Sequence, residues 1–415
     1  MFSVGTDLVE IERIRRSVKN PRFCSRVFGE AETARLVVRG FPVESAAAAF
    51  CAKEAFSKAI GTGLWAFDMK EVQLLHNEKT GEPKLALSGK ALRLAGNSRF
   101  SVSVAHTARY ASAIVVREQS SAALPPESEG LEILCSMLKP READSNKGDY
   151  GRLLCVCGSE GMAGAAAMSI EAALRCGTGI VEAALPKSIY PIVASRLAEP
   201  VFTLFHPLPD VSASSEDGKA LSQALKRASA VLIGCGVGKS SAARSEVEQV
   251  LRESAAPVVL DADGINLLAE HIDILRECKA PLILTPHPGE MARLLGTTPR
   301  EVQSCREETA RRFAEEYRVV LVLKGAGTLV AAPDGRLYRN TTGNPGMAKG
   351  GSGDVLAGMI ASFAAQGIEL WRAAAGAVYL HGLAGDRCAA KYSQTAMLPT
   401  DLIGMLPELL REFGR

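Results

Sequence analysis

Residues 350–354 read Gly-Gly-Ser-Gly-Asp and run directly into an apolar segment of helical character at 355–360. Glycines let main-chain N–H groups turn toward a ligand, and a helix start adds unpaired donors and positive dipole, so this junction predicts a phosphate site. Asp354 is expected at about the first helical position, where its carboxylate is within reach of whatever carries the phosphate, and this pairing indicates phosphoryl transfer. The alternative is that the glycines only make a turn and Asp354 only caps the helix.

Three polar loops each follow an apolar run typical of a buried strand. They are residues 261–266 (Asp-Ala-Asp-Gly-Ile-Asn), 285–290 (Thr-Pro-His-Pro-Gly-Glu) and 324–328 (Lys-Gly-Ala-Gly-Thr). His287 lies between two prolines, which restrict its backbone, and Lys324 could bind a nucleotide together with the main chain that follows it. Ligands bind at the carboxyl ends of parallel strands, so we expect these loops to form one site, although each could be only a turn.

The glycine-rich run at 234–240 (Gly-Cys-Gly-Val-Gly-Lys-Ser) does not fit a P-loop, because that motif needs glycine at position 233, which is isoleucine. It remains a glycine turn after a strand, where a ligand can approach the backbone closely.

Near the N-terminus, Glu54 and Lys58 are four residues apart on a predicted helix that ends at a glycine, and therefore share one face. A surface salt bridge between them is the simpler interpretation. Asp7 lies on the first predicted strand, where an acid is an unusual packing choice. It could be a ligand or simply solvated.

The surrounding patterns predict two domains. Residues 1–118 combine helices with two antiparallel strand pairs, near 71–87 and 100–116, and form a small α+β domain. Residues 119–130 are rich in Pro and Ser and read as a linker. Residues 131–415 alternate helices with short apolar strands and predict a doubly wound α/β domain with a mostly parallel sheet.

The bulk composition narrows the class of protein. No apolar run approaches the ~18 residues that a membrane span needs, and the N-terminus lacks a secretory pattern, so we expect a cytoplasmic protein without membrane contact. Ten cysteines without a C-x-x-C pair indicate reduced thiols. The net charge of +2 divides into +6 for residues 1–118 and −4 for the rest, which favours an acidic protein partner over nucleic acid, since no nucleic-acid module accompanies the charge.

The motifs of residues 131–412, from Lys-Gly-Asp-Tyr-Gly at 147–151 through 344–358 to His-Gly-Leu-Ala-Gly-Asp at 381–386, closely resemble the NAD(P)H-hydrate dehydratase family of the ribokinase-like superfamily. The resemblance implies repair of hydrated NADH or NADPH, NAD(P)HX, with ADP or ATP and a divalent cation. It also implies site residues. The dinucleotide would contact Ala165, Gly236, His287 and Asp354, and the nucleotide would contact Lys324, Gly325, Ala326, Gly327, Thr328 and Gly353.

Residues 1–118 are similar to holo-acyl-carrier-protein synthase, on the motifs at 4–11, 23–28, 52–63 and 103–107. This resemblance implies transfer of 4′-phosphopantetheine from coenzyme A (CoA) to a serine of apo acyl carrier protein, in a homotrimer. Asp7 and Glu54 would bind Mg²⁺, Lys58 would offset charge on the leaving group, and His106 with Thr107 would contact CoA. Ala105 departs from the serine that many relatives have there, and Arg13, Arg16 and Arg26 would face the acidic carrier.

Two rival functions stay open at this point. The second domain could be a ribokinase-like small-molecule kinase, and the first could bind a carrier protein without catalysis. Retention of both Asp7 and Glu54 argues against the latter, because a docking surface needs neither carboxylate.

Overall fold

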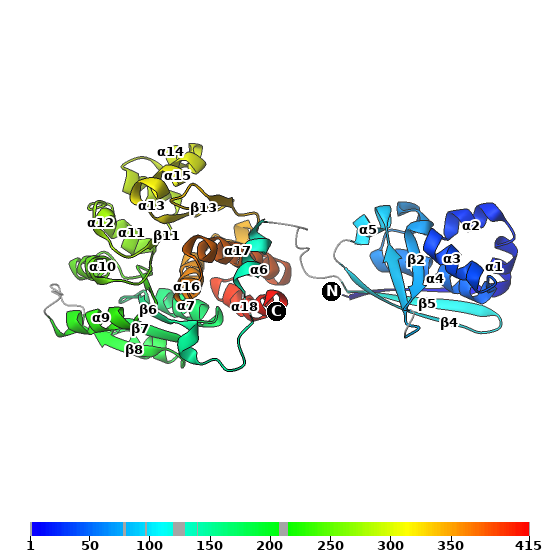
Figure 1. Cartoon of the computed structure of the whole chain (residues 1–415), viewed down its shortest axis with the longest axis horizontal. Helices are drawn as coiled ribbons and strands as arrows, with labels where there is room; N and C mark the ends of the chain where they lie inside the picture. The colour runs from blue at the N-terminus through cyan, green and yellow to red at the C-terminus, as the bar shows by residue number, and fades with distance from the viewer. Residues whose placement is uncertain are drawn as a thin grey trace. The chain divides into compact units, whose positions relative to one another are not determined.

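The computed structural model describes residues 2–77, 80–95, 98–118, 129–138, 140–206 and 215–414. The chain divides into two compact units, residues 1–125 and 126–415 (Figure 1). Of the predicted linker, residues 119–128 lie outside the described part, and a helix already begins at Glu129.

The first unit has the mixed helix and strand content that the sequence predicts. Its described elements are β1 (Phe2–Glu10), α1 (Ile11–Ser17), α2 (Pro21–Val27), α3 (Glu30–Val38), α4 (Val43–Ile60), the 3-10 turns η1 (Leu64–Ala66) and η2 (Met69–Glu71), β2 (Val72–His76), β3 (Pro83–Leu87), α5 (Gly89–Ala95), β4 (Arg99–His106) and β5 (Tyr110–Glu118). Strands β2 and β3 pair antiparallel, as do β4 and β5, so both predicted pairs are confirmed. Strand β1 joins β5 to complete the order β1-β5-β4.

Helix α4 packs closely against β1, and Gly5 makes that approach possible. A Cβ atom at Gly5 would lie 1.9 Å from the carbonyl oxygen of Ala55 and 2.6 Å from the amide nitrogen of Ala59. The buried alanines of α4 keep the helix side of the contact equally flat. Small residues on both elements therefore bring the side chains of Glu54 and Lys58 next to Asp7.

The second unit alternates strands and helices. Its described elements are α6 (Glu129–Met137), η3 (Lys147–Tyr150), β6 (Arg152–Val156), α7 (Ala163–Arg175), β7 (Ile180–Pro186), α8 (Tyr190–Ala194), β8 (Val201–Phe205), α9 (Glu216–Arg227), β9 (Ala230–Ile233), α10 (Ser241–Glu253), β10 (Val258–Leu260), α11 (Ala262–Leu268), α12 (Ile274–Glu277), β11 (Leu282–Leu284), α13 (Pro288–Leu295), α14 (Pro299–Ser304), α15 (Arg306–Tyr317), β12 (Val320–Leu323), β13 (Leu329–Ala331), β14 (Leu337–Arg339), η4 (Pro345–Met347), α16 (Ser352–Ala365), α17 (Leu370–Ala396) and α18 (Pro399–Phe413).

Within the described residues, these strands form a nine-stranded sheet in the order β14-β13-β12-β11-β10-β9-β6-β7-β8. The pairs from β12 to β8 are parallel, and β13 and β14 add an antiparallel edge. The doubly wound α/β fold is thus confirmed. Because β12, β11, β10, β9 and β6 are neighbours, their carboxyl ends lie side by side at one edge.

Both faces of the sheet are covered. Alternate strand residues such as Leu154, Val231 and Leu260 join a core that includes side chains of α9, α10, α11, α13 and α15. The intervening residues, such as Cys155 and Leu232, are equally buried and point to the opposite face, since successive side chains alternate. Helices α7, α16, α17 and α18 gather away from α9–α12 in Figure 1. Burial on both sides explains why the strands are continuous apolar runs.

Candidate functional site

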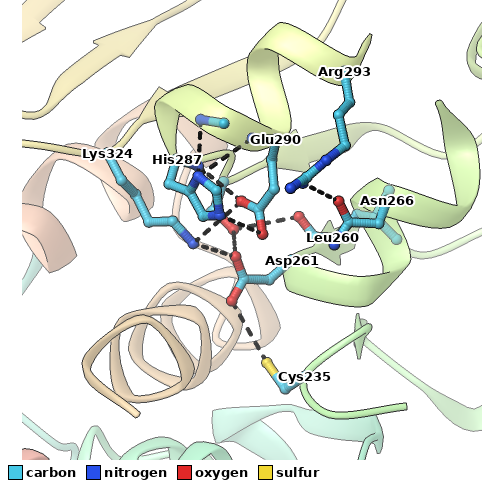
Figure 2. A network of polar contacts seen from close by, with 10 residues as sticks. Cys235, Leu260, Asp261, Asn266, His287, Glu290, Arg293 and Lys324 are labelled. Carbon is cyan, nitrogen blue, oxygen red and sulfur yellow. Dashed lines mark hydrogen bonds and ion pairs between the residues drawn. The ribbon is translucent and has the colours of Figure 1, made fainter. Parts of the chain in front are cut away.

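Polar residues meet where β12, β11, β10 and β9 end. Lys324 follows β12, His287 follows β11, Asp261 follows β10, and Cys235 follows β9 (Figure 2). Thr285 is the first residue after β11. The polar loops predicted from the sequence therefore lie together at the carboxyl edge of the sheet, beside the glycine turn.

Lys324 and Asp261 form the centre of this cluster. The ammonium group of Lys324 donates to Oδ1 of Asp261 at 2.6 Å, and the hydroxyl group of Thr285 donates to the same oxygen, also at 2.6 Å. The Asp261 side chain is 1% exposed, and these two donors offset the cost of burying its carboxylate. Although burial opposes it, the carboxylates of Asp261 and Glu290 raise the pKa of Lys324, which keeps the ammonium charged.

Asp354 is the third residue of α16, not the first as predicted. The difference arises because Gly351, with φ of 104°, serves as the N-cap and Ser352 already has helical geometry. Gly353 lies against the Lys324–Asp261 pair, since a Cβ atom there would be 3.4 Å from the Lys324 ammonium. Burial and the charge of Asp261 raise the pKa of Asp354 to about 6, while Lys324 opposes the shift. A carboxylate with this pKa suits a general base near neutral pH.

Cys235, Asp261 and Asp354 each place one potential ligand atom within 4.8 Å of the others. The Cys235 thiol donates to Asp261 at 3.8 Å, and a hydrogen bond with Cys157 together with burial raises the pKa of Cys235 well above its ordinary value. A protonated thiol is a poor ligand for a hard divalent cation, which prefers oxygen. Of these three residues, Asp261 already contacts a cation, the ammonium group of Lys324.

His287 caps α13 and has a defined tautomer. Its Nδ1 atom accepts hydrogen bonds from the amides of Gly289 at 2.9 Å and Glu290 at 3.3 Å, so the proton of the neutral ring is on Nε2. Burial and the charge of Lys324 lower the pKa of His287. Burial also raises the pKa of Glu290 to about 7. The His287 side chain is half exposed, and its Nε2 atom lies 3.4 Å from Oε1 of Glu290.

The predicted nucleotide loop connects β12 to β13. Gly325 and Gly327 have φ values of 141° and 63°, which other residues adopt only with strain. The Thr328 hydroxyl donates to the Gly325 carbonyl at 2.9 Å and closes the turn, which also contains Ala326. The loop is therefore a tight glycine turn that begins with a largely buried cation, Lys324, whose side chain is 18% exposed.

Ala165 and Gly236, which are 71 positions apart in the sequence, are in contact. A Cβ atom at Gly236 would lie 2.8 Å from Cβ of Ala165, and Gly236 has φ of 67°. The absence of a side chain at Gly236 therefore lets the two segments pack closely. The structure thus brings Ala165 next to Gly236, and brings Asp354, Gly353 and Lys324 next to Asp261.

Two buried polar atoms adjoin the start of α16. The hydroxyl oxygen of Ser352 and Nε2 of His381 are buried without a hydrogen-bond partner in the described part of the chain. Burial lowers the pKa of His381 to about 4, so its ring is neutral. Unsatisfied polar groups at a glycine-rich helix start fit a site for a polar ligand such as phosphate.

In the first unit, Lys58 pairs with Asp7. Its ammonium lies 2.9 Å from Oδ1 of Asp7 and 2.8 Å from the carbonyl oxygen of Thr6, so the simpler interpretation of a Glu54–Lys58 bridge is wrong. Burial first, and then the charge of Asp7, raise the pKa of Glu54, while Lys58 and Arg13 lower it. Two carboxylates that repel each other fit a hard divalent cation such as Mg²⁺, which would relieve the repulsion.

His106 ends β4, and Thr107 organises the turn that follows. The Thr107 hydroxyl accepts hydrogen bonds from the amides of Arg109 at 3.2 Å and Tyr110 at 3.1 Å. The side chains of His106 and Thr107 are exposed. Their predicted contact with CoA stays a prediction.

Sequence reasoning did not assign individual roles to several residues of the C-terminal site, namely Cys235, Asp261, Thr285 and Glu290. Asp261 and Glu290 were visible as acids directly after strands, which is the signal that could have selected them. Within the described part of the chain, every helix falls short of the length or the apolarity needed to cross a bilayer.

Comparisons with known proteins match each unit separately. A family model described as NAD(P)H-hydrate dehydratase matches residues 153–408, and one described as the 4′-phosphopantetheinyl transferase superfamily matches residues 3–115. Both resemblances inferred from the motifs are thereby confirmed at the level of the family.

Individual relatives agree for the second unit. The chain is 46% identical to the bifunctional NAD(P)H-hydrate repair enzyme Nnr of Moorella thermoacetica, over 66% of this chain and 52% of the relative. It is 41% identical to the ADP-dependent (S)-NAD(P)H-hydrate dehydratase of Neisseria meningitidis, over 60% of this chain and 81% of the relative. The chain therefore spans about half the length of Nnr-type relatives.

Among solved structures, the ADP/ATP-dependent NAD(P)H-hydrate dehydratase of Bacillus subtilis, co-crystallised with ATP and Mg²⁺, superposes with a TM-score of 0.59. It is 31% identical in sequence, and the match covers 68% of this chain and 97% of that structure. The shared fold extends over nearly the whole of that relative.

Proposed function

This chain belongs to the NAD(P)H-hydrate dehydratase family, and we propose that its second unit restores NADH or NADPH from the hydrated forms at the expense of ADP or ATP. The observation that carries the proposal is the position of Asp354. Its carboxylate lies at the start of α16 beside the Lys324–Asp261 pair and has a pKa raised to about 6. A carboxylate at this position is next to a helix start and an ammonium group, both of which favour phosphate.

Hydroxide is a poor leaving group, so the reaction first converts the ring hydroxyl into a phosphate ester. Asp354 takes the hydroxyl proton while the oxygen forms a bond to the terminal phosphorus, and the bond from that phosphorus to the rest of the nucleotide breaks. The ring nitrogen then donates its electron pair, the carbon–oxygen bond breaks, and phosphate leaves. Loss of a proton from the adjacent carbon restores the double bond of NADH or NADPH.

The nucleotide is proposed to bind between the turn at 324–328 and the segment at 350–353. Fixed N–H donors and the Lys324 ammonium stabilise negative charge on the transferring phosphoryl group without needing to reorganise. The relative crystallised with ATP and Mg²⁺ supports a cation that accompanies the nucleotide.

The hydrated dinucleotide is proposed to bind near Ala165, Gly236 and His287. The contact of Ala165 with Gly236 supports this, because it brings the two predicted segments together at the glycine turn. The half-exposed ring of His287 would contact the dinucleotide without adding charge, because its pKa is lowered by burial and by Lys324.

The test is to incubate the full chain with heat-hydrated NADH and either ADP or ATP. A dehydratase regenerates absorbance at 340 nm, whereas a small-molecule kinase of the same fold does not. Comparison of the two nucleotides also identifies the phosphoryl donor.

For the first unit, we infer that it transfers 4′-phosphopantetheine from CoA to a serine of an apo acyl carrier protein, as fatty acid synthesis requires. The superfamily match and the proximity of Asp7, Glu54 and Lys58 support this inference. Asp7 and Glu54 would hold Mg²⁺, which would neutralise diphosphate charge when bound. Lys58 would offset charge on the departing 3′,5′-ADP, while His106 and Thr107 would contact CoA.

Assembly as a homotrimer through the first unit is also proposed. Val4 and Leu8 on β1 are 57% and 65% exposed, and Ile114 on β5, paired with Thr6 between them, is 47% exposed. These apolar side chains point to the sheet face opposite α4, so association would bury them. Sedimentation of the full chain should show a trimer, and Ile114→Lys should yield monomers.

The transferase proposal is tested by following labelled phosphopantetheine from CoA onto an apo acyl carrier protein with Mg²⁺ present. Transfer supports catalysis. Binding of the carrier protein without transfer would identify a docking module instead.

A further inference from the structure

Arg306 holds the main chain of the predicted nucleotide loop. It is the first residue of α15, and its Nη1 atom donates to the Ala326 carbonyl at 2.7 Å. Its Nη2 atom donates to the carbonyls of Leu323 at 3.1 Å and Lys324 at 3.4 Å. One guanidinium group therefore connects three carbonyls at the end of β12 and in the turn that follows.

These contacts orient the loop amides. In a trans peptide, the N–H of each residue points opposite to the preceding C=O, so carbonyls 324 and 326 turned toward Arg306 direct the N–H groups of Gly325 and Gly327 away from it. Gly325 also lets the guanidinium come close, since a Cβ atom there would lie 3.1 Å from Nη2 of Arg306. The two glycines and Arg306 together produce a turn with donors on its other side.

Arg306 also keeps its charge uncompensated. Across the described residues, no carboxylate forms an ion pair with Arg306, and the adjacent Glu307 pairs with Arg339. The Nε atom of Arg306 is buried without a hydrogen-bond partner. Burial, aided by the nearby charge of Arg339, lowers the pKa of Arg306. A partly buried cation that contacts only neutral carbonyls is costly for the fold, and an anion bound at the loop would lower that cost.

We propose that Arg306 is a positioning residue for the nucleotide: it fixes the turn at 324–328 so that the amides of Gly325 and Gly327 face the phosphates, and it supplies an uncompensated positive charge behind them. The inference rests on the proposed function of the second unit as a nucleotide-dependent enzyme. Arg306 acts through the loop and does not touch the reacting atoms.

The chain provides a matched control on the same helix. Arg311 is exposed and donates to the Gly335 carbonyl in the turn between β13 and β14. Arg311→Gln therefore removes an arginine–carbonyl contact of α15 that does not involve the nucleotide loop. The full chain would be compared as wild type, Arg306→Gln, Arg306→Lys and Arg311→Gln.

Calorimetry would measure the affinity for ADP, and kinetics would give KM separately for ADP and for hydrated NADH. Arg306→Gln should weaken ADP binding and raise KM for ADP about tenfold, while KM for hydrated NADH changes less than about twofold. Arg306→Lys keeps the charge but not the planar fork, so an intermediate value is expected. Arg311→Gln should match wild type.

Equal ADP affinity in Arg306→Gln and Arg311→Gln would overturn the proposal, as would equal rises in both KM values, which indicate a general structural role. If Arg306→Gln does not fold, unchanged ADP affinity in Arg306→Lys overturns it instead. If wild type binds ADP without regenerating NADH, the dehydratase proposal fails, while the ADP affinities still decide the role of Arg306.

Discussion

The ammonium group of Lys324 lies 2.6 Å from Oδ1 of Asp261, although 63 positions separate the two residues in the chain. The pair joins the end of β12 to the end of β10 and lies against Gly353 at the start of α16. The Lys324–Asp261 pair therefore holds the two strand ends and the start of α16 together at the proposed phosphoryl-transfer site.

Lys324→Met should lower the free energy of unfolding by about 3 kcal/mol, because it leaves the buried Asp261 carboxylate without its cation. Urea denaturation would measure the loss. Adding Asp261→Asn should recover part of the stability. As a control, Glu270→Gln removes an exposed ion pair of the same 2.6 Å length with Arg244 and should cost less than about 1 kcal/mol. Equal losses in the two single variants would contradict the buried-pair account.

The pH dependence of turnover follows from the pKa of Asp354, raised to about 6. A general base must be ionised, so kcat/KM for hydrated NADH should fall as pH decreases through about 6. Initial rates between pH 5 and 8 would measure this. A rate that stays constant down to pH 5 would exclude Asp354 as the base.

The same shift predicts a stability effect of defined sign. The folded pKa of Asp354 exceeds the ordinary value of 3.8, so between about pH 4 and 6 the native state binds more protons than the unfolded state. The free energy of unfolding should therefore decrease as pH rises through that window. Asp354→Asn cannot ionise and should remove this contribution, up to about 2 kcal/mol, when urea midpoints at pH 4.5 and 7 are compared. If the free energy of unfolding changed with pH equally in wild type and in Asp354→Asn, the raised pKa of Asp354 would be refuted.

Gly358 sets the position of α16. A Cβ atom there would lie 2.1 Å from the Ser169 carbonyl oxygen on α7, so Gly358→Ala should cost about 3 kcal/mol and displace Asp354, reducing turnover. At Gly404, inside α18, a Cβ atom would meet no other atom within 4 Å, and Gly404→Ala should stabilise by about 0.5–1 kcal/mol. Thermal unfolding and NADH recovery would be measured for both. If Gly358→Ala and Gly404→Ala changed stability and NADH recovery equally, the close packing of α16 against α7 at Gly358 would be contradicted.

In the first unit, Glu54→Gln should reduce phosphopantetheine transfer at least about 100-fold, because the proposed Mg²⁺ site loses one of its carboxylates. Removing Mg²⁺ with a chelator should have the same effect on wild type. Glu44→Gln, on the same helix but in an exposed pair with Arg15, should leave transfer nearly unchanged. Transfer by Glu54→Gln at the wild-type rate would rule out this site. The dehydratase rate should be the same in all three proteins.

The fold was largely predictable because burial on both faces leaves a clear pattern. The runs at 230–233 and 282–284 coincide with β9 and β11, and the one at 257–260 differs from β10 by a single residue. The start of α16 was less predictable. Gly351 adopts a left-handed conformation as the N-cap, and only the three-dimensional packing decides which glycine of the cluster does so.

The loops of the site were predictable, but their contacts were not. Asp261 pairs with Lys324 and Thr285 through sheet neighbours that are distant in sequence, and the apparent helix pair of Glu54 and Lys58 gives way to a bridge from Lys58 to Asp7. Local spacing carries no information about which strand end lies opposite. For the same reason, Arg306 was indistinguishable from the other arginines of a charged helix.

The most direct test of the central claim is the turnover of Asp354→Asn with hydrated NADH and ADP, measured at 340 nm alongside binding of each ligand by calorimetry. The substitution keeps size and removes the base, so we predict nearly normal binding with NADH recovery reduced by at least about 1000-fold. Recovery close to the wild-type rate would contradict the assignment of Asp354 and the phosphoryl-transfer mechanism built on it.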